Sequence, residues 1–218
     1  MAFALRAVHA IAAAAPLRAP TRAAALRARA VTSPLSIRAM AEEVVDAPDG
    51  VEQLVDLRVG RVLTATKHED ADKLYVETVD VGEAEPRTIC SGLVPYMSAE
   101  DIEGKTVVVL ANLKSRNMQG VPSHGMLLAA SDASHEKVEL LLAPDDAVPG
   151  ERVSFGDVAA ADMAEAHTEN QMKKKKTWEK VQPGLRTTDD CVASYKDMPM
   201  MTSAGPVTCG SIKGGSIG

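Results

Sequence analysis

The fold class that this sequence predicts is all-β with a minor helical part, built as a closed barrel of five or six short strands. Three observations predict it. Apolar or alternating runs recur between residues 54 and 156, and turn-forming residues separate them at regular intervals, as in a small barrel rather than a parallel sheet. Hydrophobic residues make up 45% of the chain but aromatic residues only 3%, so aliphatic side chains must fill the core. The 218 residues suffice for one such domain and a small appendage.

The first half of the barrel follows from the spacing of its apolar residues. Residues 55–59 alternate apolar and polar side chains, as a half-buried strand does. Gly60 follows and predicts a bulge or a bend. A second strand is expected at 74–81, where the apolar residues change phase midway, so a bulge or bend is expected there too. A third strand is expected at 87–90.

The second half of the barrel begins with a helix signal. Ser98 is a capping residue and is followed by Glu100 and Asp101, which predicts a short helix that ends near Gly104. Further strands are expected at 106–110, 126–130, 138–142 and 152–155. Short strands and one small helix in this order fit an OB-fold, the oligonucleotide/oligosaccharide-binding barrel, over residues 54–156.

The N-terminal region differs sharply in composition from the barrel. Residues 1–40 contain six Arg and no acid, the composition of an organelle transit peptide. Because the junction at 37–41 resembles chloroplast processing sites, we expect a disordered chloroplast transit peptide; a mitochondrion, or the cytoplasm if Met40 is the true start, are the alternatives. Residues 41–53 are expected to form an acidic linker. No apolar run approaches the about twenty residues of a membrane helix.

Three segments are expected after the barrel. Residues 157–172 read as a connector. Residues 173–204 read as a small lobe that is too short for a core of its own, so it must pack on the barrel, with Trp178 as an anchor rather than a base-stacking platform. The lysine run 173–176 is either a solvated linker or an extension of a nucleic-acid footprint. The Gly-rich residues 205–218 are expected to form a flexible tail.

The polar segment between the strands at 106–110 and 126–130 is the candidate binding site, because rigid sheets commonly carry binding residues on such loops. Lys114 and Arg116 can pair with phosphates. Amide, hydroxyl and imidazole groups can hydrogen-bond to phosphate or sugar, and methionines offer adaptable apolar contact. The candidate nucleic-acid contacts are Asn112, Lys114, Arg116, Met118, Gln119, Ser123, His124 and Met126.

Catalytic and metal-binding patterns are weak in this sequence. His68, Asp70 and Asp72 lack a calcium-loop spacing or a second His, so they read as turn-stabilising residues. The three cysteines are far apart and lack the paired spacing of a zinc site. Ser123 and His124 are adjacent, but nothing places an acid to orient the imidazole. We therefore expect neither enzymatic activity nor a cofactor.

Several motifs together point to one family. Those in the barrel are Leu57-Arg58-Val59-Gly60, Asp70-Ala71-Asp72-Lys73-Leu74-Tyr75-Val76, Val79-Asp80-Val81-Gly82, Ser91-Gly92-Leu93, Asn112-Leu113-Lys114, Ser123-His124-Gly125-Met126 and Val148-Pro149-Gly150. In this order they resemble the tRNA-binding domain of endothelial monocyte-activating polypeptide II. Similar domains occur in the yeast synthetase cofactor and at the C-termini of some tyrosyl- and methionyl-tRNA synthetases. Residues 174–179 and 188–196 resemble the C-terminal extension of the polypeptide II branch.

The resemblance implies a function and an assembly state. It implies a non-catalytic protein that binds the outer corner of the tRNA and assists an aminoacyl-tRNA synthetase. It also implies an extension that imitates a second protomer, so that the chain stays monomeric.

The loop also departs from this family. Relatives commonly have Pro, a basic residue and Arg where this chain has Ser115, Asn117 and Gln119. Residues 54–156 carry ten bases and seventeen acids, a net charge of −7. Because phosphate contacts dominate nucleic-acid affinity, these losses favour weaker binding. The alternative is therefore a protein-interaction or scaffold module of a synthetase complex with weakened RNA affinity.

Overall fold

The computed structural model describes residues 50–218. The expected transit peptide and most of the expected acidic linker lie outside these residues. The end of that linker is wrongly predicted, because η1 (Val51–Leu54) is a 3-10 helix whose Glu52 is buried.

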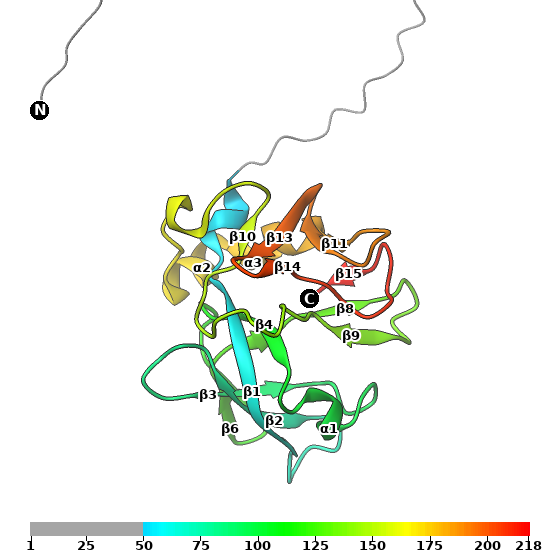
Figure 1. The fold of residues 1–218 in the computed structure, drawn as a ribbon. Coiled ribbons are helices and arrows are strands. Elements are labelled where there is room, and N and C mark those ends of the chain that lie inside the picture. Colours follow the sequence, from blue (N-terminus) through cyan, green and yellow to red (C-terminus); the bar gives the residue numbers. More distant parts are fainter. Residues whose placement is uncertain (1–49) are drawn as a thin grey trace, which may run out of the picture. The chain divides into compact units, whose positions relative to one another are not determined.

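The barrel is built on a five-stranded antiparallel sheet in the order β3-β2-β1-β4-β7 (Figure 1). Its strands are β1 (Leu57–Lys67), β2 (Tyr75–Asp80), β3 (Arg87–Ser91), β4 (Thr106–Leu110) and β7 (Met126–Leu127). The long strand β1 pairs with β2 through its C-terminal half and with β4 through its N-terminal half. This mostly β architecture confirms the predicted fold class.

The helix predicted after Ser98 is α1 (Ala99–Ile102). Ser98 and Asp101 form a reciprocal capping box, in which each side chain accepts a hydrogen bond from the other residue's backbone N–H. Ile102 is fully buried against the barrel strands. The capping signal in the sequence therefore gave the correct start of this helix.

The apolar run of β4 is explained by burial on both faces of the strand. All five residues of β4 are buried. Val107 and Val109 face a core inside the barrel, whereas Val108 and Leu110 face a second core. A strand covered on both sides reads as a continuous apolar run rather than an alternating one.

The expected irregularities lie elsewhere than the sequence suggested. The register shifts in β1 between Val62 and Thr64, opposite a regularly alternating β2. The apparent change of phase in β2 arises because Glu77 is a fully buried, inward-facing residue, so the predicted bulge in β2 is wrong. Gly60 lies in an unbroken ladder with β4. A Cβ there would lie 2.8 Å from a methyl group of Val79, so close packing rather than a bulge requires this glycine.

The strand expected at 126–130 changes sheets. Its first part, β7, pairs with β4 in the barrel sheet, and its second part, β8 (Ala129–Ser131), pairs with β9 (Val138–Leu140) in another sheet. That sheet has the order β10-β13-β12-β11-β15-β8-β9, with β14 paired to β13. It therefore joins barrel strands to strands of the C-terminal region.

The C-terminal region forms small helices followed by short strands. The helices are η2 (Ala160–Asp162), α2 (Glu169–Lys175), α3 (Thr177–Val181) and η3 (Gln182–Gly184). The strands are β10 (Ser154–Phe155), β11 (Leu185–Thr187), β12 (Ala193–Tyr195), β13 (Met198–Thr202), β14 (Gly205–Pro206) and β15 (Ser216–Ile217). The expected connector thus contains η2 and the start of α2, and the lysine run lies on and just after α2 rather than in a linker.

The prediction of a flexible tail at 205–218 is wrong. β15 pairs with β8 on one side and with β11 on the other. Val207, Cys209, Ile212 and Ile217 are buried. The glycines of this segment therefore serve tight turns and close packing between buried residues, not disorder.

One hydrophobic core joins the C-terminal region to the barrel. Leu57, Val108 and Leu110 from the barrel lie in the same buried cluster as Leu185 and Tyr195. The ring of Tyr195 also packs edge-on against that of Phe155, at a centroid distance of 6.0 Å. Among the described residues, no helix has the length and apolar character needed to cross a membrane.

Candidate functional site

The candidate loop contains a β-hairpin. β5 (Arg116–Met118) pairs with β6 (Val121–Ser123), and Gln119 and Gly120 form its two-residue turn with φ values of 51° and 96°. Positive φ at both central residues is the geometry of the type I′ turn that matches the twist of a hairpin. The Asn117 side chain accepts a hydrogen bond from the Gly120 N–H at 2.8 Å. The sequence departures at 117 and 119 therefore occupy a well-formed turn.

Arg87 holds the two ends of this loop together. Its Nη1 donates hydrogen bonds to the carbonyl oxygens of Ala111 at 2.6 Å and His124 at 2.9 Å. Its Nη2 lies 2.6 Å from a carboxylate oxygen of Glu83, whose pKa is lowered mainly by its hydrogen bond from Arg87. Arg87 could not be predicted as a site residue, because nothing in its local sequence shows which carbonyls it reaches.

His68 braces the hairpin from the turn between β1 and β2. The Asp70 N–H donates to its Nδ1 at 3.0 Å, so Nε2 carries the proton and donates to the Met118 carbonyl oxygen at 3.1 Å. The imidazole is buried. His68 was expected to stabilise its own turn; the structure adds a contact to the hairpin that spans 50 residues of sequence.

Two of the predicted contact residues form part of the scaffold. The Asn112 side chain is buried, accepts from the Asp56 N–H and donates to the carbonyl oxygens of Leu54 and His167. Ser123 is also buried; its hydroxyl accepts from the Cys90 N–H. Both side chains are buried and hydrogen-bonded to backbone groups, so the structure gives them a role in holding the loop, and their prediction as nucleic-acid contacts stays a prediction.

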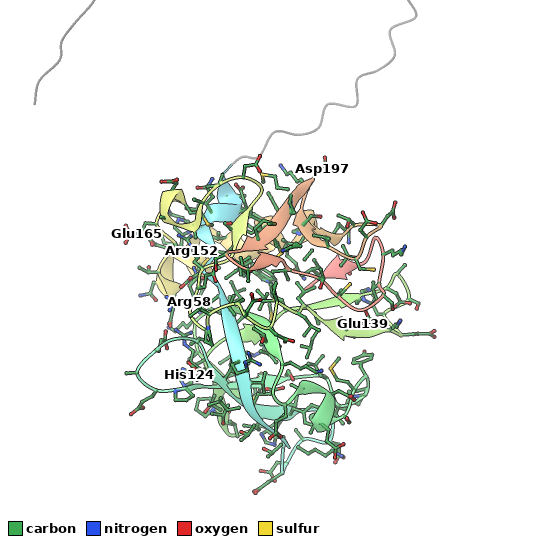
Figure 2. The ribbon with its side chains drawn as sticks, viewed as in Figure 1. Arg58, His124, Glu139, Arg152, Glu165 and Asp197 are labelled. Carbon is green, nitrogen blue, oxygen red and sulfur yellow. The ribbon has the colours of Figure 1, made fainter. Side chains whose placement is uncertain are left out.

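The remaining predicted residues reach the surface to different degrees. Lys114, Arg116, Gln119 and His124 are exposed, whereas Met118 and Met126 are half-buried. Figure 2 shows His124 beside the barrel strands, on the opposite side of the view from Glu139. Among residues 50–218, neither Lys114 nor Arg116 forms an ion pair with a carboxylate. Both cations are therefore available to an anionic ligand.

Two hollows border these cations. One, of about 440 Å³, is lined by Lys114 and Arg116 together with Lys173, Trp178 and Glu179 of the C-terminal region. The other, of about 540 Å³, is lined by the same two cations and by apolar barrel residues. The base of the hairpin therefore borders both hollows. The hollow lined by Lys173 and Glu179 is called the polar hollow, and the one lined by apolar barrel residues is called the apolar hollow.

The lysines of α2 are not equivalent. The Lys175 ammonium donates to Nε2 of His167 at 3.2 Å, and desolvation together with Lys175 and Lys180 lowers the pKa of His167. Lys173 is exposed and borders the polar hollow. Lys173 is therefore the member of the run that lines the same hollow as Lys114 and Arg116. Trp178 packs half-buried against the shared core, as an anchor would.

Fold and site together define an OB-type barrel that carries a braced hairpin with two exposed cations at its base, a class of module that binds oligomeric ligands. A family model described as "Putative tRNA binding domain" matches residues 57–152. The chain belongs to this family. The crystal structure of the C-terminal domain of Plasmodium vivax p43 is similar, with 36% identity and a TM-score of 0.69, over 76% of this chain and 98% of that one.

Curated relatives match the same part of the chain. The cytoplasmic tyrosine–tRNA ligase of Xenopus laevis is 46% identical over 76% of this chain, which corresponds to 31% of the ligase. The aminoacyl tRNA synthase complex-interacting multifunctional protein 1 of Mus musculus is 48% identical over 66% of this chain and 44% of that protein. A probable methionine–tRNA ligase of Oryza sativa is 46% identical over 75% of this chain and 20% of the ligase. The chain therefore spans less than half the length of each of these relatives.

Proposed function

We propose that this chain is a non-catalytic tRNA-binding module that binds the phosphate backbone of folded tRNA through its hairpin. The observation that carries the proposal is the placement of Lys114 and Arg116. Both are exposed, both lack an ion pair within the described part of the chain, and both border a hollow with Lys173. Three cations converging on one concavity suit adjacent phosphates of one strand.

The bracing of the hairpin supports this assignment. Arg87 fixes the ends of the loop and His68 fixes its first strand. A ligand then meets cations whose backbone is already ordered, so less conformational entropy is lost on binding. Asn117 and Gln119 contribute to the turn but add no charge, so the number of phosphate contacts is small. The affinity should therefore depend only moderately on the salt concentration.

The test is a tRNA titration at two salt concentrations with the double variant Lys114→Ala/Arg116→Ala. We expect affinity to fall for all tRNAs alike, and the slope of log affinity against log salt to drop by about two units, because each lost phosphate contact lowers it by about one. The matched control is Lys105→Ala/Lys213→Ala, which removes the same charge from exposed positions outside the hairpin. Equal affinities of the hairpin variant and the wild type at fixed salt would overturn the site.

Association with an aminoacyl-tRNA synthetase is the second part of the proposal. It is supported by the names of the relatives, which include two tRNA ligases and a synthase complex-interacting protein. Recovery of a synthetase with the full chain from RNase-treated extract is the expected result. Recovery only while RNA is intact would assign the association to tRNA instead of to a protein contact.

Chloroplast targeting by residues 1–40 remains a proposal that rests on their six Arg and absence of acids. We expect a fusion of these residues to a fluorescent protein to enter isolated chloroplasts and to be shortened there. Entry into mitochondria alone would move the assignment to that organelle.

A further inference from the structure

We infer that the apolar hollow beside the hairpin receives one unpaired nucleobase of the bound RNA, with Tyr96 as its stacking surface. This inference deepens the proposed function and rests on it. The hollow has a volume of about 540 Å³ and is lined mainly by aliphatic and methionine side chains, among them Leu93, Met118, Met126 and Leu127. A concavity of this size with apolar walls and a few polar groups is typical of a site for a small aromatic group.

Tyr96 is the feature that favours a flat ligand. It is one of three large hydrophobic side chains exposed in the described chain, with 42% of its surface accessible, and it lines the hollow. The backbone that carries this ring is held in a turn, because Tyr96 N–H and Met97 N–H both donate to the Leu93 carbonyl oxygen, at 2.9 and 3.1 Å. The hydroxyl of Tyr75 also donates to the Met97 carbonyl oxygen at 3.0 Å. An exposed aromatic ring on a fixed turn is a suitable platform for base stacking.

The charges at the rim favour a nucleotide over an uncharged ligand. Lys114 and Arg116 line the apolar hollow as well as the polar one. A strand whose phosphates lie on these cations can turn one base into the apolar hollow, while its neighbouring phosphates continue towards Lys173. The combination of anionic and flat aromatic groups in one ligand matches this arrangement, whereas a phospholipid lacks the flat aromatic ring and an aliphatic peptide supplies only the apolar part.

The Ser91 hydroxyl oxygen can accept a hydrogen bond from the edge of a base in the hollow. Ser91 lines it, and its hydroxyl donates to the buried carboxylate of Glu77. The second carboxylate oxygen of Glu77 has no hydrogen-bond partner among residues 50–218. Burial raises the pKa of Glu77 to about 7. This pair fixes the Ser91 hydroxyl next to an otherwise apolar wall, where one polar contact orients a base.

The experiment compares a single-stranded hexaadenylate with a blunt RNA duplex that carries the same number of phosphates. We expect Tyr96→Ala in the full chain to weaken hexaadenylate binding about tenfold, as loss of one stacked base does, and to leave duplex binding unchanged. Tyr96→Phe should retain the wild-type affinity, because the ring remains. Leu63→Ala is the matched control, since Leu63 is 43% exposed but does not line the hollow.

The outcomes separate this inference from the proposed function. If Tyr96→Ala binds hexaadenylate as the wild type does while Lys114→Ala/Arg116→Ala weakens both RNAs, the base pocket is overturned and the phosphate site stands. If the charge variant leaves both RNAs unaffected, the proposed function fails. An equal loss with Leu63→Ala would also count against the pocket, because it would show a general effect of removing exposed apolar surface.

Discussion

The two hydrophobic cores of this protein share strands β1 and β4 but are closed by different parts of the chain. The barrel core, around Val79, Ile89 and Val109, is enclosed by barrel strands and α1. The shared core, around Val108 and Tyr195, lies between the barrel sheet and the C-terminal region. The barrel strands and α1 therefore enclose the barrel core by themselves. The other face of the barrel sheet, which carries Leu57, Val108 and Leu110, is fully covered only when the residues after Gly156 are present. The C-terminal region is not a separate domain but the other half of a core.

Removal of residues 157–218 should have the largest effect, because it opens the shared core and leaves the barrel core enclosed. It uncovers Leu57, Val108 and Leu110, which are fully buried in the full chain. Exposed contiguous apolar surface drives association. We expect the shortened chain to dimerise or aggregate and the full chain to be monomeric, as measured by light scattering. A full chain that is itself a dimer, or a shortened chain that stays monomeric, would contradict the role of the C-terminal region as a cover.

Leu185→Ala tests whether the shared core and the barrel core unfold together in one cooperative transition. Leu185 is fully buried, and truncation of such a side chain costs about 2–5 kcal/mol of unfolding free energy. Because the two cores share β1 and β4, we expect one urea transition, shifted to lower concentration. Ile89→Ala in the barrel core is the matched variant and should shift the same transition. Two separate transitions in Leu185→Ala would show that the C-terminal region unfolds on its own.

Glu139→Gln tests how the last segment is held in place. Burial raises the pKa of Glu139, but hydrogen bonds from Ser211 and Ile212 and the contact with Lys137 outweigh it and lower the pKa to about 2. A lowered pKa stabilises the fold above the unfolded value near 4.5, and this stabilisation is lost as pH falls from about 4.5 towards 2. We expect the variant to lose about 1–3 kcal/mol at pH 7.

The pH dependence gives the check on this interpretation. The difference between wild type and Glu139→Gln, measured by urea unfolding, should narrow as the pH is lowered from 5 to 3. A difference that stays constant over this range would mean that the charge of Glu139 does not hold Ser211.

Glu77→Gln is expected to raise the unfolding free energy instead of lowering it, and to have the smallest effect of these substitutions. Burial raises the pKa of Glu77 to about 7, so the unfolded state releases its proton first as pH rises from about 4.5 to 7. Stability then falls with pH across this window and levels off above it. The amide is neutral at every pH, so we expect the variant to remove this slope and to gain roughly 1 kcal/mol at pH 8. A pH profile identical to that of the wild type would refute the raised pKa.

Short sequence patterns correctly predicted those elements that depend on residues adjacent in the sequence. The capping box at Ser98 marked α1, and the continuous apolar run of 106–110 marked β4. The pattern of β2 was not predictable in the same way, because the buried acid Glu77 at an inward-facing position looks like a change of phase. The turn-rich tail 205–218 was misread for a related reason: its order comes from pairing with β8 and β11, which lie far away in the sequence.

The exposure of the two cations was predictable from the sequence, whereas the hydrogen bonds around them were not. Lys114 and Arg116 are exposed as expected, because charged residues on a hairpin rarely bury without a partner. The buried roles of Asn112 and Ser123 depend on backbone groups from other parts of the chain. The same holds for Arg87, which reaches carbonyls at both ends of the loop. Such long-range hydrogen bonds leave no periodic signal in a sequence.

The place of β15 between β8 and β11 also sets the order of events during synthesis. Ser131 and Ser216 are hydrogen-bonded across a separation of 85 residues. A ribosome that adds about 5–20 residues per second needs roughly 4–17 seconds to make the intervening chain. For that time the edge of β8 has no partner from β15, so the nascent barrel carries an open edge until β15 emerges. Completion of this sheet therefore depends on residues that are made well after β8, and the newly made barrel is most prone to mispairing before they arrive.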